Sequence, residues 1–158
     1  MNTERTIKSL GLAVTFAVTF CVIAAKEPGV TAQEVKFGLL AQAVIKDNAL
    51  PVFPDGLKKL EGTHVRISGF VMPYDDPKNL QKMILLETPG GCFFCSPPNI
   101  NTVVFVRCTP QDRPREYSPE PVVVEGTLHL WHADMKEDDE ARQFLFTIDD
   151  AKANALRH

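Results

Sequence analysis

Apolar residues recur with two different periods along the chain, and the change of period divides it. Between residues 35 and 45 they are spaced three or four apart, which predicts a short amphipathic helix. Asp47 ends this pattern, and Pro51 and Pro54 keep the helix from continuing. We therefore expect a helical lead-in over residues 33–56, ahead of the main domain.

Beyond this lead-in the period changes to two, which is typical of strands. Alternating positions predict two long strands, and short apolar runs predict strands that are buried on both faces. Gly69 and Gly126 lie midway along the long strands and indicate a bend or bulge in each. Asp149 and Asp150 are expected to begin a short terminal helix. The predicted strands cover residues 64–73, 83–86, 103–106, 122–130 and 144–148.

Five strands of this size would leave long open edges in a flat sheet, whereas a closed barrel removes them. We therefore predict a mainly β fold over residues 57–153: a small five-stranded OB-like barrel with a short N-terminal helix packed against it. Residues 109–120, which carry three prolines, should form an exposed connection. The charged run 136–140 should be a solvated hairpin tip.

The N-terminus carries the pattern of an export signal. Arg5 and Lys8 precede residues 9–25, which contain no charge, and small residues follow with possible cleavage after Ala25 or Ala32. The alternative is an uncleaved anchor, because 17 residues are near the lower limit for spanning a bilayer. Residues 1–32 are thus a signal peptide, or an N-terminal membrane anchor, plus a linker. The protein is expected to be periplasmic, or else anchored in the inner membrane only through residues 9–25.

Composition and motifs narrow the function classes further. The formal net charge of -3 offers no basic field for nucleic acid. The sequence has no serine nucleophile elbow, no glycine-rich phosphate loop and no H-E-x-x-H motif. These features favour a non-catalytic role.

The candidate chemistry lies between the second and third predicted strands, where Cys92 and Cys95 are separated by two residues. In an oxidising compartment they could form a disulfide, or one could pair with Cys108. The spacing also suits a metal such as zinc or copper, although a closed site needs two more ligands and there is no second pair. A redox pair is expected to open a helix, whereas Pro97 and Pro98 and then a strand follow here. Plain packing of buried thiols is the fourth interpretation.

Other candidate ligands are weaker. Cys108 shares strand parity with core valines and should lie at the strand end away from the loop. His129 and His132 are three residues apart, so on a strand they point to opposite faces and would need a bulge to share a metal. His132 is expected at the barrel rim, where it could meet a ligand alone. Trp131 is expected to be a packing residue.

The motifs carry a resemblance to a known family. The string from Leu60 to Pro73 resembles the L-x-G-x-x-V-x-I-x-G-[FY]-x-x-P opening of a family of exported bacterial proteins catalogued only as a domain of unknown function. Further matches, in order over about residues 57–150, are Ile84–Leu86, Pro97–Asn99, Val103–Val106 and Pro121–Leu128. Family members commonly carry a Cys-containing loop here, often with adjacent cysteines or a cysteine near a histidine; this chain has the two-residue spacing instead. The resemblance implies a small exported β-barrel and supplies no activity.

We therefore expect an exported envelope accessory protein that binds a metal ion or a partner protein through the Cys92–Asn99 loop. A thiol–disulfide or metal-redox protein that uses Cys92 and Cys95 is the first alternative. A structural domain in which a disulfide staples the loop is the second. Glycines let such a loop approach a partner closely, and phenylalanines give it an apolar contact. The binding residues would be Gly91, Phe93, Phe94, Pro97, Pro98 and Asn99.

Overall fold

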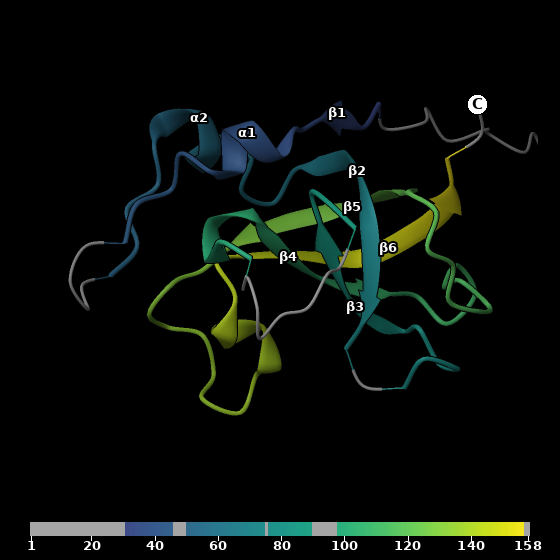
Figure 1. The fold of residues 1–158 in the computed structure, drawn as a ribbon. Helices are drawn as coiled ribbons and strands as arrows, with labels where there is room; N and C mark the ends of the chain where they lie inside the picture. Colours follow the sequence, from purple (N-terminus) through teal and green to yellow (C-terminus); the bar gives the residue numbers. More distant parts are fainter. Residues whose placement is uncertain (1–30, 46–49, 75, 90–97, 157–158) are drawn as a thin grey trace, which may run out of the picture.

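The computed structural model describes residues 31–45, 50–74, 76–89 and 98–156, and a closed five-stranded barrel forms its centre (Figure 1). β3 pairs antiparallel with β2 and β4, β6 is parallel to β4 and antiparallel to β5, and β5 closes the barrel on β2. This order is that of an OB-type barrel, so the predicted fold class is confirmed. The strands are β2 (His64–Pro73), β3 (Lys82–Leu86), β4 (Val103–Cys108), β5 (Val122–Leu130) and β6 (Phe146–Ala155).

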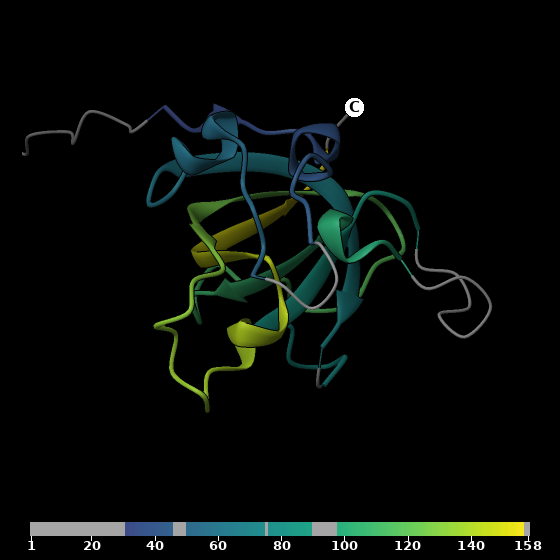
Figure 2. The ribbon, with the colours of Figure 1, turned by 90° about the vertical axis from the view of Figure 1, so that its left-hand side faces the viewer.

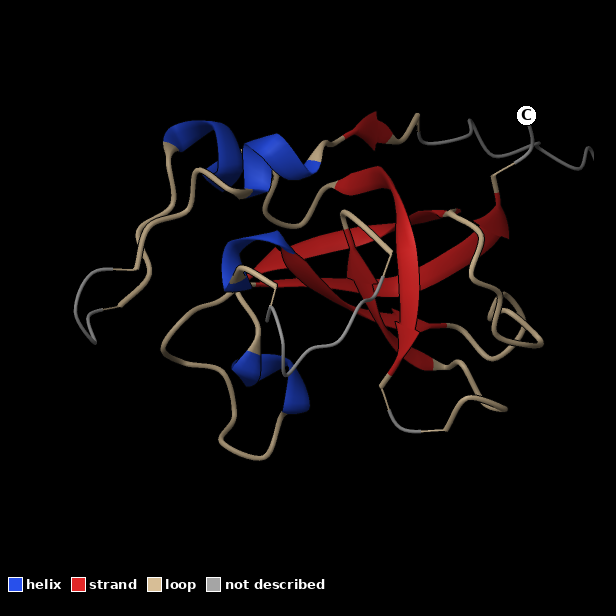
Figure 3. Ribbon diagram, viewed as in Figure 1, coloured by secondary structure: helices blue, strands red, loops and turns tan. Residues whose placement is uncertain are grey.

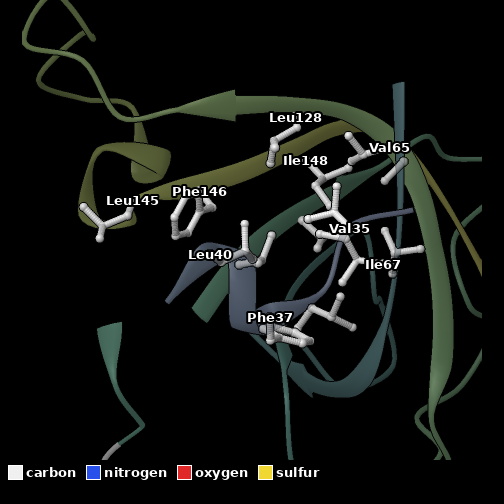
Figure 4. Close-up of a cluster of buried hydrophobic side chains, with 14 of the residues drawn as sticks. Val35, Phe37, Leu40, Val65, Ile67, Leu128, Leu145, Phe146 and Ile148 are labelled. Atoms are coloured by element: carbon white, nitrogen blue, oxygen red, sulfur yellow. The ribbon is translucent and has the colours of Figure 1, made fainter. Parts of the chain in front are cut away.

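The alternating pattern predicted the two long strands correctly. β2 and β5 have the bounds that the period of two predicts, and Val65, Ile67 and Leu128 point into the barrel core (Figure 4). Gly126 lies at a register shift between Glu125 and Thr127. A Cβ on Gly126 would lie 2.6 Å from Ile148 Cγ2 and 2.7 Å from the Asp149 carbonyl oxygen, so only glycine allows β5 and β6 to approach this closely.

The lead-in is more elaborate than its sequence pattern indicates. The predicted helix is present but short, as α1 (Phe37–Leu40), and its Phe37 and Leu40 pack into the barrel core (Figure 4). β1 (Gln33–Glu34), at the beginning of the stretch expected to be a helical lead-in, pairs parallel with the start of β2. A second helix, α2 (Asp55–Lys58), begins directly after Pro54 (Figure 3). Pro54 is the N-cap residue of α2, and its carbonyl accepts from the Leu57 and Lys58 amides. The proline that was expected only to end a helix therefore also precedes one.

The expected terminal helix at Asp149 and Asp150 is wrong. β6 continues through both residues to Ala155 and pairs with β5 as far as Val122. Asp150 adopts a φ of 50° within the strand, where the register against β5 shifts. The two carboxylates therefore belong to an irregular strand rather than to a helix cap.

The connection between β5 and β6, residues 131–145, folds back over the outer face of β3 and β4 (Figure 2). Phe144 stacks on Phe105 with ring centroids 4.9 Å apart, and the Tyr74 ring meets the Phe105 ring edge-on at 5.0 Å. This outer cluster explains why β3 and β4 are buried on both faces, as their apolar runs predict.

The charged run of this connection is only partly a solvated tip. Glu140 pairs with Lys82 at 2.6 Å and Asp139 pairs with Arg107 at 3.0 Å. Asp139 also caps the short helix η2 (Glu140–Gln143) by accepting from the Ala141 amide. The prediction of a solvated tip is therefore wrong for these two acidic residues, which fasten the connection to the barrel.

The barrel has two ends that carry different segments. At the helical end, α1 and α2 lie near η1 (Ile100–Thr102) and the 131–145 connection, on the left of Figure 1. At the distal end lie the β2–β3 and β4–β5 connections and the end of β6. No helix within the described ranges is long and apolar enough to cross a membrane. The division at residues 32, 56 and 153 and the export signal remain predictions.

Candidate functional site

The predicted Cys loop is only partly within the described residues. Cys92, Cys95, Gly91, Phe93, Phe94 and Pro97 lie outside them, whereas Pro98 and Asn99 lie within. Asn99 caps η1: its side chain accepts from the Asn101 amide at 3.1 Å, and its carbonyl accepts from Thr102 Oγ1 at 2.9 Å. The loop is therefore followed by a short, locally hydrogen-bonded turn that leads directly into β4.

A hydrogen bond connects this turn to the lead-in. Asn101 Nδ2 donates to the Ala43 carbonyl at 2.6 Å, although the two residues are 58 apart in sequence. On the other side of the loop, Leu86 pairs with Val103 across β3 and β4. The β-sheet and the lead-in thus fix both flanks of the segment that the sequence singles out.

An exposed apolar surface lies next to the hydrogen bond between Asn101 and Ala43. Val44 and Val52 form an antiparallel bridge with N–O distances of 3.0 and 2.8 Å, directly after the Ala43 carbonyl that Asn101 contacts. Leu50 and Val52 are 63% and 60% exposed. We call the following residues the apolar patch: Val44, Ile45, Leu50, Val52 and Ile100.

The apolar patch was missed in the sequence for two reasons. Residues 44 and 45 fall in the pattern that predicts a helix over residues 35–45, whereas α1 ends at residue 40. The other three patch residues belong to no periodic element. Leu50 and Val52 alternate with prolines, a pattern that indicates only an irregular segment. The juxtaposition with Ile100 depends on the long-range Asn101–Ala43 contact. A signal was nevertheless present, since large apolar residues in a proline-containing connection are either buried or available for contact.

The two candidate histidines line one surface hollow of about 390 Å³ between the strands β4, β5 and β6 and the 131–145 connection. His129 Nδ1 lies 3.0 Å from Glu61 Oε1, and Glu61 Oε2 accepts from the Leu130 amide at 2.6 Å. His132 follows the end of β5 and is exposed, so strand parity does not apply to it. Within the described part of the chain, no three His, Cys, Asp or Glu side chains are arranged to hold a metal ion.

An ion-pair network crosses the same hollow. Arg107 donates to both carboxylate oxygens of Asp149, at 2.6 and 2.8 Å, and to Asp139 at 3.0 Å. The hydrogen bond to Asp149 raises the pKa of Arg107 against the opposing effect of burial. Because Arg107 joins β4, β6 and the 131–145 connection, its role here is to hold these elements together.

Cys108 is a free thiol buried at the distal end, so the structure does not bring it together with His132. Burial, followed by the nearby Asp112 carboxylate, raises the pKa of Cys108 to about 12. A metal-binding or nucleophilic cysteine is a thiolate, which this environment disfavours. Cys108 therefore behaves as a small core residue. Trp131 packs against the core and donates its indole N–H to the Arg142 carbonyl at 3.0 Å, as a packing residue does.

The face through which OB-type barrels bind extended ligands is occupied by the chain itself. In such folds, exposed side chains on the second and third barrel strands contact oligonucleotides or oligosaccharides. Here those strands are β3 and β4, and Phe105 of β4 is fully buried beneath Phe144. The aromatic rings stack on one another, which leaves them unavailable as platforms for bases.

Comparisons with known proteins agree with the resemblance seen in the sequence. A family model described as "Protein of unknown function (DUF3299)" matches residues 41–149. A crystal structure of a DUF3299 family protein from Pseudomonas aeruginosa PAO1 has a similar fold, with a TM-score of 0.54 and 17% identity over 81% of this chain and 98% of that chain. None of the curated proteins matches the chain.

Proposed function

Because the chain belongs to the DUF3299 family of proteins of unknown function, whose description names no activity, we propose a function from its own residues. It is a non-catalytic accessory protein of the cell envelope that binds a partner protein with the helical end of the barrel. The contact surface comprises the apolar patch and the Cys92–Asn99 loop, whose last residue directly precedes Ile100. Location in the envelope rests on the export pattern of residues 1–32.

The main observation that supports this proposal is the clustering of exposed apolar residues. Six large hydrophobic side chains are exposed within the described ranges, and all but Tyr117 belong to the apolar patch. Scattered apolar residues on a surface need no explanation, whereas contiguous ones mark sites of interaction. The Asn101–Ala43 hydrogen bond ties the patch to η1, and the Val44–Val52 hydrogen bonds join two of its segments to each other, so little ordering is required on binding.

The chemistry of the patch supports a protein partner over a metal ion or a nucleic acid. Aliphatic side chains contribute nothing to metal coordination, but burying them against another apolar surface is favourable. The outer face of β3 and β4 is filled by Phe144, which supports a role without nucleic acid. The phenylalanines at positions 93 and 94 would add apolar area to the same surface.

Site-specific photo-crosslinking in the producing bacterium tests the proposal. A benzophenone amino acid at Leu50 or Val52 should give one discrete protein adduct in the envelope fraction. The same amino acid at Lys152, an exposed position on β6, is the matched control and should give none. Equal adducts at all three positions would contradict the proposal. So would stoichiometric zinc or copper that is lost in Cys92→Ser while no adduct forms at Leu50 or Val52.

A further inference from the structure

A second candidate binding site lies at the distal end, where the β4–β5 connection covers the barrel. This connection encloses a cavity of about 170 Å³. Three buried core residues and two prolines line it, so the lining is mostly apolar. The apolar residues that define it are Val71, Leu80, Pro114, Pro121 and Val122.

Backbone hydrogen bonds fasten the covering connection to β6 at both ends. The Thr109 amide donates to the Ala151 carbonyl at 3.1 Å, and the Ala153 amide donates to the Asp112 carbonyl at 3.2 Å. At the other end, the Leu156 amide donates to the Pro121 carbonyl at 3.1 Å. Prolines restrict the backbone between these anchor points. The cavity is therefore preformed, as ligand sites usually are.

The charged side chains that line the cavity are both acidic. They are Glu116 and Glu120, and neither carboxylate makes an ion pair or hydrogen bond to another described residue. Arg113, on the same connection, donates to Asn79, and Arg115 does not line the cavity. Two carboxylates without partners beside an apolar cavity favour a ligand that carries positive charge next to an apolar group.

The volume of the cavity indicates whether it accommodates a whole small molecule or a single side chain. A cavity of about 150 Å³ accommodates benzene, whereas small-molecule sites typically span about 300–1,000 Å³. We infer that the distal cavity is a docking site for a partner peptide that inserts one side chain of leucine or phenylalanine size and places a neighbouring basic residue against Glu116 and Glu120. This site lies at the opposite end from the apolar patch and does not rest on the function proposed above.

Titration of the ¹⁵N-labelled full chain with short peptides tests the inference. The probe is acetyl-Gly-Leu-Arg-Gly-amide, with one analogue that replaces Leu by Ala and one that replaces Arg by Glu. The Leu-Arg peptide should shift the amide signals of Val122 and Asn154, which line the cavity. We expect at least about tenfold weaker binding without the leucine side chain. We expect at least about threefold weaker binding with Glu in place of Arg, because exposed ion pairs contribute modestly.

Charge variants of the protein test whether Glu116 and Glu120 cause the preference for the peptide with Arg over the peptide with Glu. In Glu116→Gln/Glu120→Gln the preference for Arg over Glu should disappear, while the apolar interior is unchanged. Glu137→Gln/Asp138→Asn carries the same charge change on the exposed tip of the 131–145 connection and should keep the preference. Equal binding of the three peptides, shifts confined to residues elsewhere, or no shift at all would overturn the inference. Stronger shifts with benzyl alcohol than with the Leu-Arg peptide would also overturn it, since they would indicate a site for a small neutral molecule.

Discussion

The aromatic ring of Phe144 holds the 131–145 connection against the barrel, so Phe144→Ala should loosen this connection. The ring is buried, stacks on Phe105 at 4.9 Å and meets Tyr74 edge-on at 6.0 Å. Truncation of a buried phenylalanine costs about 3–5 kcal/mol, and a favourable aromatic pair contributes about 0.5–1.5 kcal/mol beyond buried area. Because the connection lies on the outer face and can settle after truncation, we expect the lower end, about 3 kcal/mol.

Thermal unfolding and tryptophan fluorescence measure this effect together. A loss of about 3 kcal/mol in a chain of this length should lower the Tm by about 10 °C. Trp131 is the single tryptophan of the chain, and its indole N–H donates to the Arg142 carbonyl within the same connection. Its emission should therefore shift to longer wavelength in Phe144→Ala when the connection loosens.

Glu137→Ala is the control, since Glu137 is exposed on the same connection. Its unfolding free energy should stay within about 0.5 kcal/mol of the parent chain. If Phe144→Ala unfolds like this control and the Trp131 emission does not move, the connection is not held by the aromatic cluster. The reasoning that the outer face of β3 and β4 is closed would then be refuted.

Three further substitutions test other parts of the account. Gly126→Ala should destabilise the fold by about 1–3 kcal/mol in urea unfolding, because its Cβ would lie 2.6 Å from Ile148 Cγ2; an unchanged midpoint would contradict this. Asn101→Ala should cost about 1 kcal/mol through loss of the bond to the Ala43 carbonyl, and an unaltered stability would show that this bond does not fasten η1. Burial raises the pKa of Cys108 from 9.0 to about 12, so the Cys108 thiol should resist iodoacetamide at pH 8 until the protein is unfolded. The unfolded chain releases this proton first, so stability relative to Cys108→Ala should be intact below pH 9 and fall as the pH rises towards 12; parallel pH profiles would oppose this.

The barrel strands could be predicted because the sequence of each strand by itself indicates a strand. In β2 and β5 the inward residues alternate with polar ones, so the period of two indicates both the strand and its buried face. The predicted bends at Gly69 and Gly126 coincide with backbone approaches that exclude a side chain. The closed barrel follows from the need to remove open edges, whereas the position of β6 between β4 and β5 depends on pairing between distant segments.

The features that were missed depend on contacts between distant segments. β1 is a strand only because Val65 and Arg66 of β2 lie beside it. Asp149 precedes a residue in the left-handed region and still continues β6, because pairing with β5 overrides its preference for a helix cap.

Asp139 and Glu140 look solvated in the sequence, and their partners Arg107 and Lys82 come from other strands. Ile100 likewise lies beside the rest of the apolar patch because Asn101 binds the lead-in.

The central claim, that the apolar patch and the segment around the Cys loop form one partner-binding surface, is tested most directly by a reporter outside the patch. A benzophenone amino acid at Thr88, exposed just before the loop, should form an adduct with the envelope partner. Leu50 and Val52 are about three-fifths exposed, so burying them would stabilise a complex by about 1–2 kcal/mol each. Leu50→Ser/Val52→Thr should therefore reduce the adduct at least about tenfold, while Tyr117→Ser, at an exposed apolar residue of the distal end, leaves it unchanged. An adduct of equal yield in both variants would contradict the claim.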